Sequence, residues 1–302
     1  MRLLVLPSRT GGLARLVMIN DDELQPWRQI GRGQAGWREA VERALDQVAD
    51  VQPLDVPRSG RVLLAGDWHG DGGWAQRMLE RAGDDGLELV IQLGDFGIGM
   101  AGMGGSEGYL DAIDATAARA GVRLLFLDGN HENFPYLYRF PLHATGLRPV
   151  RRHIWHIPRG FRWTWGEKTW QAVGGATSTD RVHRREGADW WPEEALTDDD
   201  AESIAVAARD ERVGVLLTHD APRDAPLDSG RWPVDWAEVD RVLAEEHRDR
   251  LSRVCKALRP RKVVHGHWHY RYQETVETTW GSCEFIGLHC NGGEANVATL
   301  TI

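Results

Sequence analysis

The sequence predicts an α/β fold, and two observations support that prediction. From Arg61 onward, short apolar runs typical of buried strands alternate with stretches that have helical periodicity. Polar residues of metal-binding types follow directly after these runs. Open α/β folds place their sites at the carboxyl ends of strands, so both observations favour one layered α/β arrangement.

The composition is that of an ordinary globular protein. The chain has 302 residues, of which 42% are hydrophobic and 27% charged, enough for one large domain or two small ones. The formal net charge is −9. This balance disfavours non-specific binding of nucleic acid, because such binding depends on Lys and Arg. The oligomeric state is not predicted.

The cysteines and the apolar runs bear on location. The three cysteines include no CxxC pair, which argues against a disulfide framework and suits a reducing cytosol. A zinc cluster of Cys283, His289 and Cys290 is an alternative, although cysteines in strand-like sequence are more typical of buried apolar residues. The apolar start of the chain is too short for a signal peptide. No run reaches the ~20 residues of a membrane span, so we expect a cytoplasmic protein without membrane segments.

Residues 1–58 precede the first motif and are expected to form an N-terminal extension that packs on a main domain of residues 59–302. The extension contains one predicted helix at 36–48, followed by a connector rich in Pro and Gly. It looks too small to bury a core alone.

The main domain has a clear order of expected elements. Strands are predicted at 61–66, 87–93, 122–127 and 213–217, and helices near 72–82, 107–120 and 235–258. The segments 153–173 and 262–302 are interpreted as antiparallel strands, and 174–211 as a loop-rich polar insertion. The apolar face predicted for the last helix comprises Trp236, Val239, Val242, Leu243, Leu251, Val254 and Leu258.

Five short motifs contain residues of the types that commonly bind metal ions. They are Gly-Asp-Trp-His-Gly at 66–70, Gly-Asp at 94–95, Gly-Asn-His-Glu at 129–132, Thr-His-Asp at 218–220 and His-Gly-His-Trp-His at 265–269. Together they offer two aspartates, one asparagine and several histidines. That set is too large for one metal and suits two.

Each motif also has a simpler interpretation. Asp67 of the Asp-x-His pair could be a helix N-cap, Asp95 a turn residue, and His219 a core histidine bonded to a carbonyl. As a ligand, the Asp95 carboxylate could bridge two cations. Asp128 is expected to be an ordinary turn residue. The joint occurrence of the motifs, each after an apolar run, favours the metal site.

In this order, the motifs resemble those of the calcineurin-like metallophosphoesterase superfamily, over roughly residues 60–302. The resemblance implies a four-layer αββα sandwich of two mixed sheets, with a dinuclear metal centre at the strand ends. One metal would be bound by Asp67, His69, Asp95 and His269, and the other by Asp95, Asn130, His219 and His267. His131 would be the catalytic histidine. Mn²⁺ is the first expectation for both ions, with Fe, Zn or Ni as alternatives.

The activity implied by the resemblance is hydrolysis of phosphate mono- or diesters by a metal-bound hydroxide. The substrate would be a phosphorylated small molecule or a nucleotide. Phosphoprotein phosphatases continue the second motif as Gly-Asp-x-x-Asp-Arg-Gly, whereas residues 94–100 here lack the second Asp and the Arg. This departure favours the broader phosphoesterase branch. A nuclease and a non-catalytic scaffold that binds a partner are the alternatives.

Several further residues are candidates for binding substrate. Arg181, Arg184 and Arg185 cluster in the insertion, and arginine suits phosphate; a solvated charged loop is the alternative. Trp68 and Trp268 lie inside ligand motifs and could line the substrate site or stack a base. Most of the other tryptophans, such as Trp163, Trp165 and Trp170, are expected in the core.

Overall fold

A computed structural model of the chain describes residues 2–6, 15–19, 52–100, 107–208, 212–227 and 237–302. Two six-stranded sheets form the centre of the described part, and each mixes parallel inner strands with antiparallel edge strands.

The first sheet has the order β14-β3-β4-β5-β7-β6. Its strands are β3 (Arg61–Ala65), β4 (Leu89–Gln92), β5 (Arg123–Phe126), β6 (Arg148–Pro149), β7 (Ile154–His156) and β14 (Val297–Thr301). Strands β3, β4, β5 and β7 are parallel, and the edge strands β14 and β6 pair antiparallel to their neighbours.

The second sheet has the order β12-β13-β11-β10-β9-β8. Its strands are β8 (Arg162–Trp165), β9 (Lys168–Val173), β10 (Val215–Thr218), β11 (Lys262–His265), β12 (Tyr272–Thr278) and β13 (Gly281–Gly287). Strands β9, β10, β11 and β13 run parallel, while β8 and β12 are the antiparallel edges.

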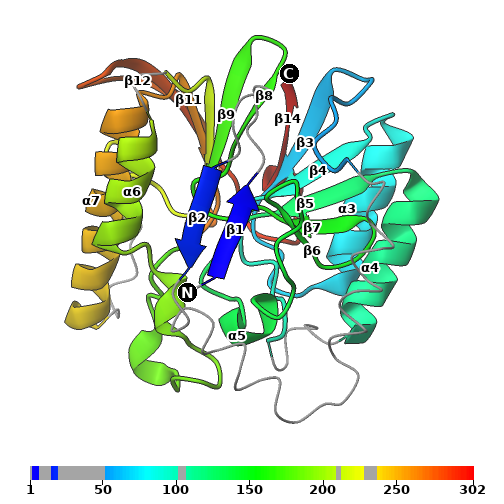
Figure 1. Ribbon diagram of the computed structural model, residues 1–302, viewed down its shortest axis with the longest axis horizontal. Coiled ribbons are helices and arrows are strands. Elements are labelled where there is room, and N and C mark those ends of the chain that lie inside the picture. The colour runs from blue at the N-terminus through cyan, green and yellow to red at the C-terminus, as the bar shows by residue number, and fades with distance from the viewer. Residues whose placement is uncertain (1, 7–14, 20–51, 101–106, 209–211, 228–236) are drawn as a thin grey trace.

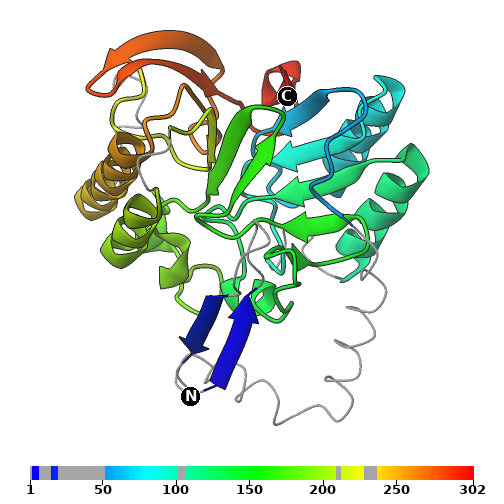
Figure 2. The ribbon, with the colours of Figure 1, turned by 45° about the horizontal axis from the view of Figure 1, so that its top comes forward.

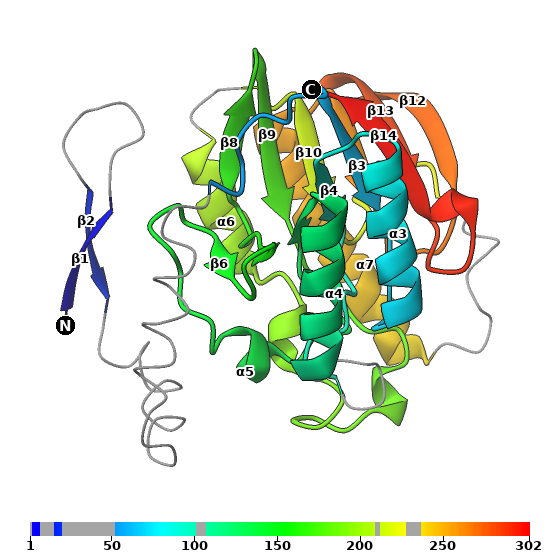
Figure 3. The same cartoon turned by 90° about the vertical axis from the view of Figure 1, so that its right-hand side faces the viewer.

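The two sheets pack face to face, and helices cover their outer faces. Helices α3 (Gly72–Asp84) and α4 (Glu107–Ala120) cover the first sheet, and α6 (Asp198–Ala207) and α7 (Glu238–Leu258) cover the second (Figures 1 and 2). Figure 3 shows α3 and α4 in front, with α6 and α7 on the far side. The expected four-layer αββα sandwich is therefore confirmed.

The inner strands are apolar on both faces because successive side chains point to opposite faces of the sheet, and both faces are buried. In β3, Val62 and Leu64 join the cluster between the sheets, whereas Leu63 joins the cluster under α3 and α4. Strands buried on both sides read as continuous apolar runs, which is the pattern of the sequence. Trp163, Trp165 and Trp170 lie in the cluster between the sheets, as predicted.

The helices next to the first sheet begin and end close to the predicted positions. Helix α3 begins after Asp71, whose side chain accepts a hydrogen bond of 2.8 Å from the Trp74 N–H as an N-cap. Helix α4 has the predicted bounds. A short helix α5 (Phe134–Leu137) follows the third motif.

Two predictions about local structure are partly wrong, and a third is incomplete. The insertion at 174–211 is rich in loops as predicted, but it also contains α6, which starts at a capping box formed by Thr197 and Asp200. It also contains short 3₁₀ helices at Arg181–His183 and Pro192–Glu194. Within 153–173, β7 pairs parallel with β5 in the other sheet, so only β8 and β9 form a hairpin. Within 262–302, β11 is parallel to both of its neighbours.

The buried face of α7 is also partly wrong. Val239 and Val242 are 47% and 43% exposed, while Asp240 and His247 are buried instead. His247 binds the buried carboxylate of Asp220 through its Nδ1, at 2.7 Å, so a polar partner sets the orientation of this half of the helix. Leu251, Val254 and Leu258 are buried as predicted, Leu243 is only partly buried, and Trp236 lies outside the described residues.

The N-terminal segment is described only at β1 (Arg2–Leu6) and β2 (Arg15–Ile19), which pair antiparallel with each other. The helix predicted at 36–48 lies outside the described residues. The division into an extension of residues 1–58 and a domain of residues 59–302 stays a prediction. None of the described helices combines the length and apolar character needed to cross a bilayer.

Candidate metal centre

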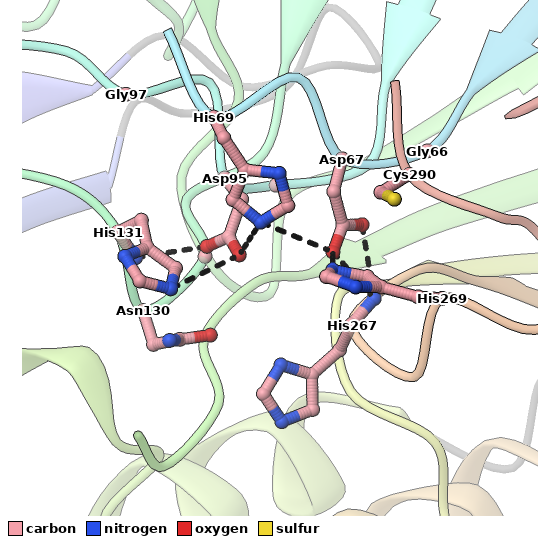
Figure 4. A network of polar contacts seen from close by, with 12 residues as sticks. Gly66, Asp67, His69, Asp95, Gly97, Asn130, His131, His267, His269 and Cys290 are labelled. Carbon is pink, nitrogen blue, oxygen red and sulfur yellow. Dashed lines mark hydrogen bonds and ion pairs between the residues drawn. The ribbon is translucent and has the colours of Figure 1, made fainter. Parts of the chain in front are cut away.

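The polar motifs gather at the carboxyl ends of the parallel strands of both sheets. Asp67 follows β3, Asp95 follows β4 and Asn130 follows β5, while His219 and His267 follow β10 and β11 of the second sheet. Parallel strands end on the same edge of a sheet, so the motifs meet although they are far apart in the sequence (Figure 4).

The backbone at these positions is strained. Among the described residues, five non-glycine residues have positive φ, and four of them are candidate ligands: His69 (47°), Asp95 (59°), His267 (63°) and His269 (50°). Such conformations cost of order 1–3 kcal/mol each and cluster at functional sites. The surrounding fold therefore holds these four residues in place at a cost in stability.

Two glycines of the motifs give the ligands room. A Cβ on Gly129 would lie 2.2 Å from Oδ1 of Asp95, and a Cβ on Gly266 would lie 2.2 Å from Oδ1 of Asp67. No side chain fits at such distances, so glycine is needed for the ligand loops to approach one another.

One group of potential ligands surrounds Asp67. Nε2 of His269 lies 2.9 Å from Oδ2 of Asp67, and Nε2 of His69 lies 3.9 Å from the same oxygen. The donor atoms of these three residues all lie within 4.8 Å of one another. Asp95 adjoins this group, because its Oδ2 is 3.4 Å from Nε2 of His69.

A second group surrounds His219. Its Nε2 lies 3.2 Å from Oδ1 of Asp95 and 3.2 Å from Oδ1 of Asn130. Asp95, His219 and His267 form a set whose donor atoms are again within 4.8 Å of one another. The two oxygens of Asp95 thus face different groups, as a carboxylate shared by two cations requires.

Hydrogen bonds behind the imidazoles select which ring nitrogen faces the centre. Nδ1 of His219 lies 2.8 Å from the Leu93 carbonyl oxygen, which can only accept, so Nδ1 carries the proton. Nδ1 of His69 lies 3.3 Å from the amide oxygen of Asn291 in the same way. In both residues Nε2 is left to bind a cation, the usual arrangement of metal-binding histidines.

The electrostatics of the site favour cations. Burial lowers the pKa of His219, but the carboxylates of Asp95 and Asp67 outweigh burial and raise it to about 10. Against the same effect of burial, Asp95 raises the pKa of His69 to about 9, and the bond to Asp67 raises that of His269 to about 10. Protons on these rings neutralise the carboxylates that divalent cations would otherwise neutralise. The donor set therefore fits two metal ions.

A model of the calcineurin-like phosphoesterase family matches residues 60–271. The chain belongs to this family. It is thus a member of a family of hydrolases that act on phosphoester bonds. None of the curated proteins matches the chain.

Solved structures similar to this phosphoesterase have low sequence identity. The protein TT1561 of Thermus thermophilus is 13% identical, with 80% of this chain and 98% of that chain covered and a TM-score of 0.47. A dimetal phosphatase from Danio rerio is 12% identical, covering 80% of this chain and 92% of that chain at a TM-score of 0.48. The purple acid phosphatase PPD1 from yellow lupin (Lupinus luteus) seeds is 14% identical, covering 80% and 46% at 0.42.

The candidate catalytic residue of this phosphoesterase, His131, lies beside the shared carboxylate. Its backbone N–H donates to Oδ1 of Asp95 at 2.8 Å, and its Nε2 lies 3.9 Å from Oδ2. Burial lowers the pKa of His131 to about 4, with Asp95 opposing this effect and the guanidinium of Arg184 adding to it.

Of the three arginines predicted to bind substrate, one meets the site. Nη1 of Arg184 lies 3.0 Å from Nδ1 of His131, and Nη2 lies 3.2 Å from Nε2. Asp180 holds this guanidinium through Oδ1 and Oδ2 at 2.6 and 2.9 Å. Arg181 instead lies over the Trp190 ring and 3.6 Å from Asp240. Arg185 is exposed.

The two tryptophans of the ligand motifs differ in position. Trp68 is fully buried and packs on Phe96, with ring centroids 5.9 Å apart. The prediction that it lines the substrate site or stacks a base is therefore wrong, because its indole belongs to the core under α3 and α4. Trp268 is only partly buried. Its Nε1 donates to Asp220 at 2.8 Å, and its ring lies under Arg248.

Two residues whose hydrogen bonds hold the ligand loops were not predicted. The carboxylate of Glu132 accepts the backbone N–H groups of Phe96, Gly97 and Ile98 at 2.7 to 3.0 Å, and so holds the loop after Asp95. Asn296 donates to the carbonyl oxygens of Asp67 and His289. Glu132 ends the third motif, so its place in the sequence was a signal, whereas Asn296 has no local signature.

Asp128 is not the ordinary turn residue that was expected. It is buried, and it binds Arg159 at 2.7 Å and His156 at 3.1 Å. The contact between Asp128 and Arg159 connects the segment just before Gly129 to the segment just before β8 of the second sheet.

Among the described residues, Cys283 and Cys290 belong to no group that could hold a metal ion. Cys283 is buried in the core under α6 and α7, as the apolar interpretation predicts.

Proposed function

We propose that this chain hydrolyses phosphate mono- or diesters at a centre of two divalent cations. The observation that carries the proposal is the position of Asp95, whose Oδ2 lies 3.4 Å from Nε2 of His69 and whose Oδ1 lies 3.2 Å from Nε2 of His219. One cation would be held by Asp67, His69, Asp95 and His269, and the other by Asp95, Asn130, His219 and His267. When bound, such a pair supplies Lewis-acid catalysis and activates water for in-line attack on phosphorus.

The protein's own residues then bind and orient the ester. The side chains of His69, His131 and His269 are 21%, 14% and 43% exposed, so the centre is open to a substrate on this side. His131 is close enough to Asp95 to contact a phosphoryl group bound at the cations that Asp95 would hold. We infer that the neutral imidazole of His131 donates a hydrogen bond to the leaving oxygen.

Arg184 is proposed as the second contact to the phosphoryl group or its ester substituent. A neutral imidazole has only one free lone pair, so both short contacts between Arg184 and His131 cannot be hydrogen bonds. In at least one of the two contacts, an N–H of Arg184 therefore faces the N–H of the His131 ring. An anionic oxygen bound between the two side chains would accept from both, which supports a phosphate ester as the ligand.

The substrate class is a phosphorylated small molecule or a nucleotide. Phosphoprotein phosphatase activity has less support, because positions 96–100 carry Phe, Gly, Ile, Gly and Met. Mn²⁺ is the first ion to test, since carboxylate, amide and imidazole donors together suit a divalent ion of intermediate hardness. Fe, Zn and Ni are the other candidates. Three free cysteines support a reducing compartment such as the cytoplasm.

The test is metal analysis together with hydrolysis of nitrophenyl phosphate and bis(nitrophenyl) phosphate. We expect two equivalents of Mn²⁺ per chain and turnover that a chelator abolishes and Mn²⁺ restores. Protein that binds two cations but cleaves neither ester would favour the alternative, a non-catalytic binding scaffold. Protein that binds no transition metal would contradict the proposal.

A further inference from the structure

A buried glutamate that is not a candidate ligand lies behind the second cation site. Glu194 is 1% exposed, in the segment between β9 and α6. Its Oε1 accepts the backbone N–H of Ser178 at 2.6 Å, and its Oε2 accepts the Ser178 hydroxyl at 2.7 Å. Burying a carboxylate is costly unless its oxygens accept hydrogen bonds, and here Ser178 donates one to each oxygen.

The direction of these hydrogen bonds extends to the ligand Asn130. A serine hydroxyl has a single proton, and here that proton is donated to Glu194. The Ser178 oxygen can then only accept from Nδ2 of Asn130, which lies 3.3 Å away. Ser178 and Glu194 therefore require the NH₂ end of the amide to face them.

The opposite end of the same amide faces the metal site. Oδ1 of Asn130 lies 3.2 Å from Nε2 of His219, the nitrogen left free to bind a cation. Only the carbonyl oxygen of an asparagine can bind a metal, because its NH₂ group is a donor without an available lone pair. A flipped amide would present that group to the cation and repel it.

A second set of contacts keeps the glutamate in register with Asn130. The guanidinium of Arg159 binds Asp128, which comes shortly before Asn130, at 2.7 Å. The same guanidinium donates to the backbone carbonyl oxygens of Glu193, Glu194 and Ala195 at 2.8 to 2.9 Å. The Gly175 N–H also donates to the Asp128 carbonyl oxygen at 2.7 Å. The two backbone segments are thus tied together independently of Ser178.

We propose that Ser178 and Glu194 are positioning residues that orient the Asn130 amide, with its oxygen toward the second cation. The inference rests on the proposed dinuclear centre and deepens it. It assigns to the insertion between β9 and β10 a role in metal affinity, separate from any contact with substrate. Neither residue touches the reacting groups.

The experiment measures the Mn²⁺ affinity of both sites in metal-depleted protein, by titration calorimetry and by electron paramagnetic resonance of the bound ions. In Ser178→Ala we expect the dissociation constant of one site to rise ~10- to 100-fold, the usual effect of removing a group that orients a ligand. The other site should change by less than ~3-fold, because its residues do not contact Ser178. Glu194→Gln should weaken the same site, because an amide can donate to Ser178 and release the hydroxyl proton toward Asn130.

Ser252→Ala is the matched control. Ser252 is also a buried serine whose hydroxyl donates to a carboxylate, that of Asp224, and accepts a backbone N–H. It lies on α7, away from the ligands, so both Mn²⁺ affinities should stay at the wild-type value. An equal loss of affinity in this control would reduce the effect of Ser178→Ala to general destabilisation and overturn the inference.

A double substitution tests the orientation directly. A carboxylate presents oxygen at both ends, so in an Asn130→Asp background the orientation is irrelevant. Adding Ser178→Ala there should weaken the second site by less than ~3-fold, a non-additive effect that is expected when two residues act through one hydrogen-bond network. Wild-type affinity in Ser178→Ala and Glu194→Gln, or an undiminished loss in the double variant, would refute the role of this pair. A wild-type protein that binds fewer than two Mn²⁺ ions would instead count against the dinuclear centre itself.

Discussion

Oδ1 of Asp95 lies 3.2 Å from Nε2 of His219, and this contact joins the two sheets at the candidate metal centre. Asp95 comes from the end of β4 in the first sheet, and His219 from the end of β10 in the second. The other oxygen of Asp95 faces His69. The shared carboxylate is therefore the point where both halves of the sandwich contribute to one site.

Replacing Asp95 by Asn should remove the bridge. An amide has one oxygen, so it can serve one cation and not two. We expect the Mn²⁺ content to fall from two ions to one or none, and turnover of nitrophenyl esters to fall by at least ~1000-fold, since the two-metal clamp supplies several kcal/mol. Metal analysis after dialysis measures the first effect. Asp199→Asn, an exposed residue of α6, is the control, and two tightly bound ions in Asp95→Asn would argue against a bridge.

Replacing His131 by Ala should separate chemistry from metal binding. His131 contacts Asp95 through its backbone N–H, which alanine keeps, so both ions should still bind. We expect kcat to fall by ~100-fold or more, the usual contribution of a positioned acid or base. An ester with a much better leaving group should lose less, because its leaving oxygen needs less stabilisation by a hydrogen bond. Full turnover of the metal-loaded variant would remove His131 from the mechanism.

Replacing Arg184 by Gln tests the proposed contact to the ester. A lost charge-assisted hydrogen bond is worth ~1.5–3 kcal/mol, so kcat/KM should fall ~10- to 100-fold with the metal content unchanged. Steady-state kinetics on a phosphodiester and a phosphomonoester will show which of the two depends more on the arginine. Arg185→Gln is the matched control, because Arg185 is a neighbouring exposed arginine. Wild-type kinetics in Arg184→Gln, as in the control, would show that Arg184 does not contact the ester.

Replacing Gly129 by Ala should disturb the site through packing alone. The added methyl would lie 2.2 Å from Oδ1 of Asp95, and overpacking typically costs ~1–3 kcal/mol. We expect a lower Tm and weaker binding of both ions, since Asp95 serves both. Gly293→Ala, where nothing lies within 4 Å of the added Cβ, should leave both unchanged. Thermal unfolding with and without Mn²⁺ measures the effect, and unaltered metal affinity in Gly129→Ala would contradict the crowding argument.

The sequence predicted the inner strands, α3 and α4 because their signals are local. A run such as 62–65 is apolar on both faces only in a doubly covered strand, and an N-cap such as Asp71 lies next to the helix that it starts. The approach of the ligand motifs also followed from local signals, because each motif comes directly after a strand. Parallel strands end on one edge of a sheet, so their followers must meet.

The predictions that failed depended on partners distant in sequence. The buried face of α7 is set partly by His247 and Asp220, and an apolar periodicity cannot reveal a buried polar pair. The core position of Trp68 could not be separated from a substrate contact, because its neighbours in the motif are ligands. Strand β11 is parallel to β10 because a long crossover containing α7 joins them, a fact of topology and not of composition.

By itself, the sequence determined the layered α/β class, the order of the strand-end motifs and the residue types that bind cations. Only the tertiary structure decided that Asp95 faces both groups, that Arg184 and not its neighbours meets His131, and that Ser178 and Glu194 lie behind Asn130. The physical reason is that backbone conformation follows from neighbouring residues, whereas the direction of a buried hydrogen bond depends on groups brought together by folding of the whole domain.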